Sequence, residues 1–145
     1  MGFEVQLLTG IGELLHRENV GRWLTTGSFG PNDTQLSIDQ LLPSPDKGIA
    51  ISLYPVDDNT GTTDSTIGLQ LLIRGSPGNK VSVKDIGDRA FDALHDLKNT
   101  EIGGVPIIRI WRQSGANLGA DASNRQESSQ NYYIQLTRTG AHRAD

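Results

Sequence analysis

Four stretches of this chain alternate apolar and polar residues with a period of two, and this alternation constrains the fold more than any other feature. A period of two places one set of side chains on one face of a β-strand. The predicted strands cover residues 48–56, 66–75, 105–114 and 129–138. A polar, turn-rich segment joins the first two, so we expect them to form a hairpin. In the last strand we expect Tyr132 to face the core and Tyr133 to face outward.

Two further segments have the 3.6-residue period of amphipathic helices. Residues 3–18 place their apolar side chains in one arc. Gly10 and Gly12 weaken this helix by up to ~1 kcal/mol each relative to Ala. Residues 79–99 form the clearest helix, with Ser82 as its expected N-cap. The outward face of this helix carries an acidic stripe made of Asp85, Asp88, Asp92 and Asp96.

The order of these elements is α-β-β-α-β-β. It predicts an α+β fold, with a four-stranded, mainly antiparallel sheet and both helices packed on one face. A chain of 145 residues has the length of one domain, and we assign residues 1–145 to it. Three segments are expected to lack regular structure: a long loop at residues 19–48, a polar arm at residues 115–128, and a flexible tail at residues 139–145.

Composition argues against several classes of function. The chain has no cysteine, which excludes disulfides, thiolate catalysis and cysteine-built metal sites. No apolar run approaches the ~18 residues of a membrane span, and no leader pattern is present, so we expect no association with a membrane. A net charge of −4 argues against nucleic acid as the main partner, because phosphate binding favours a basic surface.

No motif in the chain matches a catalytic or cofactor-binding pattern. Residues 57–68 resemble a calcium loop only superficially, because Gly61 is one position too early and Gly68 replaces the final Glu. The acidic stripe lies opposite the apolar face of its helix, so we interpret it as a solvated surface. The histidines have no catalytic partner that spacing can assign. We therefore expect no cofactor, no metal and no enzymatic activity.

Large and cationic side chains are predicted to gather on the sheet face away from the helices. If Ile108 and Ile110 point inward, the residues on either side of Ile110 point outward. The outward set is Arg74, Arg109, Trp111 and Tyr133. Such residue types anchor protein interfaces. Alternatively, the 19–48 loop covers this face as a second small core, with Trp23 packed on Trp111. Both interpretations stay open from the sequence.

Three segments together resemble a known protein family. They are "LLPSPDKGIAISLYP" at residues 41–55, "GLQLLIRG" at residues 68–75, and "GGVPIIRIWRQSGANLGADASNRQESSQNYYIQLTR" at residues 103–138. The most specific part is the series Leu118-Gly119-x-Asp121 … Asn124-Arg125-x-Glu127-x-Ser129-x-Asn131-Tyr132-Tyr133. In order and spacing, residues 10–138 resemble the tail terminator, or tail-completion, proteins of bacteriophages with long non-contractile tails, some of which are described as minor capsid proteins.

The resemblance implies a structural virion protein that forms a ring of six subunits. Such a ring caps the tail tube, ends polymerisation of the tube protein and provides the attachment surface for the head-side connector or neck protein. DNA passes through its lumen only as cargo. The implied location is the head-proximal end of the tail, with assembly in the host cytoplasm.

Within this interpretation, the polar arm is an assembly device that orders against a neighbouring subunit or the tube. Its expected contact residues are Asp121, Asn124, Arg125 and Glu127, with the Arg125 guanidinium pairing to a carboxylate of the next chain. Two other functions stay open. One is a neck or head-completion connector ring, and the other is a small cytosolic ligand-binding domain or enzyme with its ligand under the 19–48 loop.

Overall fold

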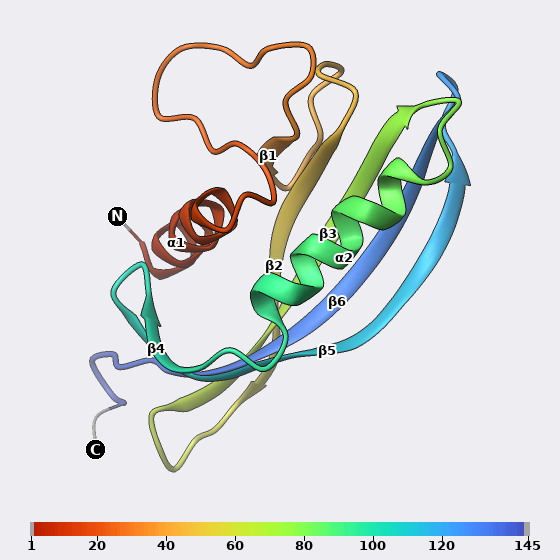
Figure 1. The fold of residues 1–145 in the computed structure, drawn as a ribbon. Coiled ribbons are helices and arrows are strands. Elements are labelled where there is room, and N and C mark those ends of the chain that lie inside the picture. Colours follow the sequence, from red (N-terminus) through yellow and green to blue (C-terminus); the bar gives the residue numbers. More distant parts are fainter. Residues whose placement is uncertain (1, 144–145) are drawn as a thin grey trace.

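A computed structural model describes residues 2–143, and in this part of the chain it contains two helices and six strands (Figure 1). The helices are α1 (Phe3–Arg17) and α2 (Ser82–Leu94). The strands are β1 (Gln35–Ile38), β2 (Gly48–Asp58), β3 (Asp64–Pro77), β4 (Lys98–Ile102), β5 (Val105–Ala120) and β6 (Arg125–Thr137). These elements form an α+β fold, which confirms the predicted fold class.

The strands form one sheet in the order β1-β2-β3-β6-β5-β4. β1 runs parallel to β2, and all other neighbours are antiparallel. The prediction of a four-stranded sheet is therefore wrong, because the edge strands β1 and β4 were missed. β1 has four residues and lies within the expected 19–48 loop, and four of the five residues of β4 are exposed and polar. Neither strand is long or apolar enough to show an alternating pattern.

One face of the sheet and both helices enclose a single hydrophobic core. Alternate residues of β3 and β6 point into it, as their period of two predicts. Its largest fully buried side chains are Leu7, Ile11, Leu15, Ile49, Ile51, Leu69, Leu71, Ile73, Leu94, Ile110, Tyr132 and Ile134. Figure 1 shows α2 running beside β3 and β6. Since both helices share this core with the same sheet face, the predicted packing on one face is confirmed.

The two glycines of α1 are sites of close packing. A Cβ on Gly10 would overlap the backbone of Gly103 in the β4–β5 turn, and one on Gly12 would overlap the ring of Trp23. The helix tolerates these two poor helix formers because they let the turn and the indole approach it. Trp23 therefore packs on α1, and it does not pack on Trp111 as the alternative interpretation required.

The N-terminus of α2 is capped by a residue upstream of the helix. Val81 occupies the N-cap position and makes no side-chain cap. Instead, Asn79 Oδ1 accepts hydrogen bonds from the backbone N–H groups of Val81 at 2.9 Å and Ser82 at 3.1 Å. The prediction that Ser82 is the N-cap is wrong, because its Oγ is occupied by the backbone N–H of Ser76 at 2.7 Å.

The C-terminus of α2 lies five residues before the predicted end. The helix stops at Leu94, and Asp96 has a φ of 68°, which a right-handed helix cannot accommodate. Asp85, Asp88 and Asp92 are exposed on the outward face, as predicted, whereas Asp96 lies beyond the helix. Residues 98–102 then form β4.

The prediction that residues 115–128 form an irregular polar arm is wrong. β5 runs to Ala120 and β6 begins at Arg125, so only a short turn separates the two strands. The register pairs Ala116 with Ser129. Small and polar residues form a regular hairpin here because the strands bond through their backbones, which needs no apolar side chain. We call the stretches 114–120 and 125–131 the distal hairpin.

The described part of the predicted flexible tail contacts the β2–β3 hairpin. Gly140 and Arg143 form an isolated bridge. The Arg143 guanidinium donates hydrogen bonds to the carbonyls of Thr62 and Asp64 and to Ser65 Oγ. Residues 144 and 145 of this predicted tail lie outside the described residues.

Candidate assembly surfaces

Three aromatic side chains lie in one row on the sheet face away from the helices. The register pairs Trp111 with Tyr133, Tyr133 with Gly68, and Gly68 with Tyr54. The rings of Trp111 and Tyr133 meet edge to face, with centroids 5.8 Å apart. A Cβ on Gly68 would overlap the ring of Tyr54. Gly68 therefore allows Tyr54 to lie across β3 toward Tyr133.

Arg109 adds a positive charge to this row. Its guanidinium carbon lies 4.3 Å from the centroid of the Trp111 ring, which is a cation–π contact. We call the set Tyr54, Arg109, Trp111 and Tyr133 the aromatic face. Three of these residues were predicted from the sequence. Tyr54 was missed, although its position next to the inward-facing Leu53 was the signal that could have identified it.

A β-bulge sets the outward direction of Arg109 and Trp111. The register of β5 against β6 shifts between Ile107 and Arg109, and both Ile107 and Ile110 are buried. Ile108 is only partly buried, so the assumption made from the sequence that both Ile108 and Ile110 point inward is wrong for Ile108. The bulge inserts one residue into the alternation, which leaves Ile110 inside and the two residues beside it outside.

The side chains of Tyr132 and Tyr133 lie on opposite faces of the sheet, as predicted. Tyr132 is fully buried, and its hydroxyl donates a hydrogen bond to Gln130 Oε1. Burial raises the pKa of Tyr132 far above its usual value. The pKa of Tyr54 is also raised, first by desolvation and then by the neighbouring Tyr133. The hydroxyls of Tyr54 and Tyr132 are therefore neutral at physiological pH.

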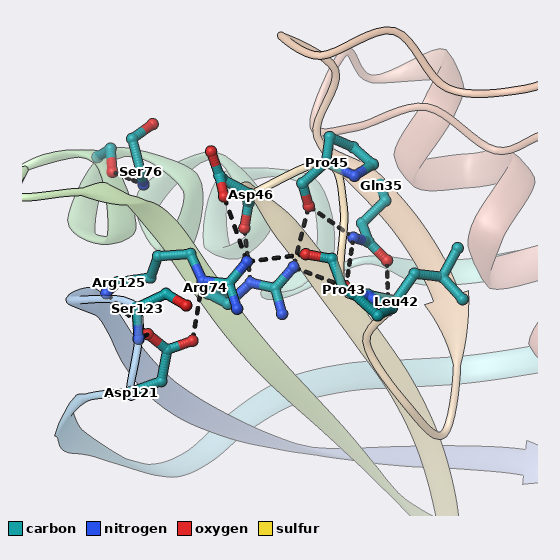
Figure 2. A network of polar contacts seen from close by, with 11 residues as sticks. Gln35, Leu42, Pro43, Pro45, Asp46, Arg74, Ser76, Asp121, Ser123 and Arg125 are labelled. Atoms are coloured by element: carbon teal, nitrogen blue, oxygen red, sulfur yellow. Dashed lines mark hydrogen bonds and ion pairs between the residues drawn. The ribbon is translucent and has the colours of Figure 1, made fainter.

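A polar network holds residues 42–46 over the end of the sheet (Figure 2). The buried Gln35 donates from Nε2 to the carbonyls of Leu42 and Pro45, and its Oε1 accepts from the Leu42 N–H. The buried Arg74 donates to the carbonyls of Leu42, Pro45 and Asp46 at 2.8, 2.9 and 2.6 Å. The two side chains thereby give hydrogen-bond partners to carbonyls of an irregular segment. Burial lowers the pKa of Arg74, with a further contribution from the nearby cation of Arg125.

Arg125 connects the distal hairpin to this network, as Figure 2 shows. Its Nε donates to Asp121 Oδ2 at 2.9 Å, and one terminal nitrogen donates to Pro43 O at 2.9 Å and to Asp46 Oδ1 at 3.2 Å. Only 12% of the Arg125 side chain is exposed. The guanidinium is thus engaged within its own chain, and an ion pair with the next subunit would require these contacts to open.

Asp121 organises the turn of the distal hairpin. Its Oδ1 accepts hydrogen bonds from the backbone N–H groups of Ser123 at 3.0 Å and Arg125 at 2.9 Å. These bonds, with that of the Arg125 backbone as the largest contribution, lower the pKa of the Asp121 carboxyl. Asn124 completes the turn with a φ of 58°, a conformation that asparagine tolerates better than most residues.

The structure divides the predicted site residues into two groups. One group, on the aromatic face, contains Arg109, Trp111 and Tyr133. The other, at or beside the polar network, contains Arg74, Asp121, Asn124, Arg125 and Glu127; the last of these pairs in register with Arg74. Gln35 and Asp46 belong to the network and were missed. Asp46 lies in an irregular segment and Gln35 in a strand of four residues, so no pattern marks either side chain as bonded.

An open groove of about 420 Å³ lies between α2 and the distal hairpin. Its lining residues include Lys84, Gly87, Arg112, Ala116 and Ser129. Within residues 2–143, no group of three or more His, Asp or Glu side chains is placed to hold a metal ion. No helix of this part of the chain is long and apolar enough to cross a membrane.

Comparisons with known proteins agree with a virion origin. No curated protein matches the chain. Among solved structures, the fold is similar to a chain of the virion of a native gene transfer agent particle, with a TM-score of 0.53 and 12% identity over 70% of this chain and 78% of that chain. At this identity the likeness is one of fold. A family model described as bacteriophage tail terminator protein matches residues 13–138, which include all six strands, α2 and the C-terminal end of α1. The chain therefore belongs to the bacteriophage tail terminator protein family and is a structural protein of a phage-type tail.

Proposed function

We propose that this chain forms a ring of six subunits that caps the tail tube, ends polymerisation of the tube protein and presents the surface to which the head-side connector attaches. The family match over residues 13–138 carries the proposal. In this role the protein acts at the head-proximal end of the tail and assembles in the host cytoplasm. DNA crosses the ring lumen as cargo, in keeping with the net charge of −4.

Closing a ring requires two different surfaces on each subunit, because a head-to-tail contact joins one patch to another. The aromatic face offers exposed Arg109 stacked on Trp111 beside Tyr133. Arg, Trp and Tyr are enriched among residues that dominate binding energy. The distal hairpin projects from another part of the molecule (Figure 1) and offers a second surface. The role needs neither catalysis nor a cofactor.

The test is the length of tails assembled without this protein. We expect tubes longer than those of the wild type, and few of them joined to heads. Purified chain added back should restore both length and joining. Antibody labelling of isolated tails should mark one end only.

Two outcomes would oppose the proposal. Tails of normal length that fail to join heads would assign the chain to a neck or head-completion ring instead. Normal length together with normal joining would show that the chain neither ends the tube nor attaches the connector.

A further inference from the structure

The C-terminal half of β5, residues 113–120, has no partner strand along one of its two edges. β4 pairs with β5 only as far as Arg109. The Arg112 N–H donates to His95 Nδ1 at 3.0 Å, and within residues 2–143 it is the last backbone group on that side with a partner. From Gln113 to Ala120, no described residue pairs with β5 on the side away from β6.

Half of β2 is also unpaired, on the other side of the sheet, and unlike the free half of β5 it contains a proline and two charges, Pro55, Asp57 and Asp58. β1 pairs with β2 from Gly48 to Ile51 only. From Ser52 to Asp58, no residue in the described part of the chain pairs with β2 on the side away from β3. The free half of β2 ends at the β2–β3 hairpin, and that of β5 ends at the distal turn (Figure 1).

The free half of β5 lacks the features that protect sheet edges. Natural proteins protect edges with short strands, charged side chains, proline or a covering segment. β4 is short and carries Lys98 and Glu101, and β1 is short and is covered by a bridge to Arg22. By contrast, residues 113–120 contain no charge and no proline, and Leu118 is 53% exposed. An exposed edge of this kind accepts an extended strand through backbone hydrogen bonds.

We propose that the free half of β5 pairs with the free half of β2 in a second copy of this chain. Because β2 and β6 both run antiparallel to β3, and β5 runs antiparallel to β6, β2 and β5 point in opposite directions within one chain. A copy placed head to tail beside the first therefore presents its β2 antiparallel to β5. The contact repeats identically at every subunit, so it can close a ring. The inference thus rests on the proposed ring and specifies the contact between its neighbouring subunits. We call this pairing of β5 with β2 of the next copy the joint.

The geometry of the two halves defines the arrangement further. They lie at opposite ends of the sheet, so neighbouring copies must be offset along their strands (Figure 1). Such an offset is the stagger that a sheet needs to close into a barrel of tilted strands. Register shifts flank Ser114–Asn117, which is therefore the regular stretch available for pairing. The joint also places Leu118 close to Tyr54 and Val56, which are exposed large apolar side chains of β2.

Disulfide cross-linking tests the joint directly, because the chain has no cysteine of its own. Leu118→Cys is combined in turn with Tyr54→Cys, Val56→Cys or Asp58→Cys, and the protein is oxidised both in solution and on isolated tails. At least one pair should give a ladder of covalent oligomers that ends at the ring size. Leu118→Cys alone should give no cross-link. Dimers from that single variant would mean that two β5 edges meet symmetrically and would overturn the proposal.

Hydrogen exchange separates backbone pairing from a contact of side chains alone. Amides within residues 113–117 should exchange about tenfold more slowly, or slower still, in the assembled protein than in the monomer. Leu118→Lys should weaken assembly by about tenfold or more. The matched control is Val81→Lys, which changes an apolar residue that is 60% exposed at the start of α2 and should leave assembly unchanged.

The outcomes distinguish this inference from the proposed function. A ring that forms without cross-links and without slower exchange in residues 113–117 would mean that subunits meet elsewhere, and only the joint would be wrong. If no ring forms in solution or on tails, the proposed function itself is wrong.

Discussion

The two halves of the β5–β6 hairpin are stabilised by different interactions. In the half near β4, Ile110, Ile134 and Leu136 are buried in the core. In the distal hairpin, the paired residues are mostly Gly, Ala, Ser, Asn and Gln, and no large apolar side chain is buried. Backbone pairing nevertheless continues through both halves. The sheet therefore extends well beyond its hydrophobic core.

The two halves should therefore differ in how mutations affect them. In the core half, a truncated side chain loses burial and leaves a cavity. In the distal half, most of the order comes from backbone hydrogen bonds and from the contacts of Arg125 with Asp121, Asp46 and Pro43. Regions with few buried apolar contacts open locally at a lower cost than the core.

The largest effect is expected from Ile134→Ala in the core half. Ile134 is fully buried in β6, so its truncation should lower the free energy of unfolding by about 2–5 kcal/mol. Denaturant unfolding followed by circular dichroism measures the change. Ser129→Ala, in the distal half of the same strand, is the control and should cost under about 1 kcal/mol. Equal losses from the two variants would mean that the distal half is as tightly packed as the core.

A smaller loss is expected from Arg125→Ala in the distal hairpin. The variant removes hydrogen bonds to one carbonyl and two carboxylates, which should cost about 1–3 kcal/mol. Amides of residues 42–46 should exchange faster, because the contacts to Pro43 and Asp46 are lost. The control is Arg89→Ala, an exposed arginine of α2, which should change neither quantity. Unchanged exchange in residues 42–46 would contradict the role of Arg125 in the network.

The Asp121 carboxyl should make the distal hairpin sensitive to acid. Its pKa is lowered in the folded state from an ordinary 3.8, so its stabilising contribution is present above that value and is lost as pH falls through the folded pKa. Unfolding of the wild type and of Asp121→Asn should be compared from pH 6 down to pH 2. The stability advantage of the wild type should shrink below about pH 4. An advantage that stays constant over this range would show that the carboxyl is not bonded as described.

The smallest effect is expected from Asp92→Ala on the exposed face of α2. Asp92 has no hydrogen bond or ion pair among the described contacts, so the free energy of unfolding should change by no more than about 0.5 kcal/mol. Its neighbour Leu94 is fully buried, and Leu94→Ala should cost about 2–5 kcal/mol. Denaturant midpoints ranked the other way would mean that α2 presents the opposite face to the core.

The sequence predicted those elements whose side chains carry the core. Both helices, the β2–β3 hairpin and the inward faces of β3 and β6 followed from apolar residues at a fixed period. Likewise, the outward placement of Arg109, Trp111 and Tyr133 was predicted. β1, β4 and the distal hairpin were missed, because their pairing depends on backbone groups that every residue other than proline supplies.

The sequence was enough to identify most of the apolar residues of the core, because burial of apolar side chains leaves a periodic pattern along the chain. Only the tertiary structure brought Gln35, Arg74 and Arg125 to the same irregular segment, and these side chains come from parts of the chain far apart in sequence. Most of their partners are backbone carbonyls, which no residue type marks. The free edges of β2 and β5 were likewise decided by how far β1 and β4 extend along them, since pairing length depends on neighbours in space.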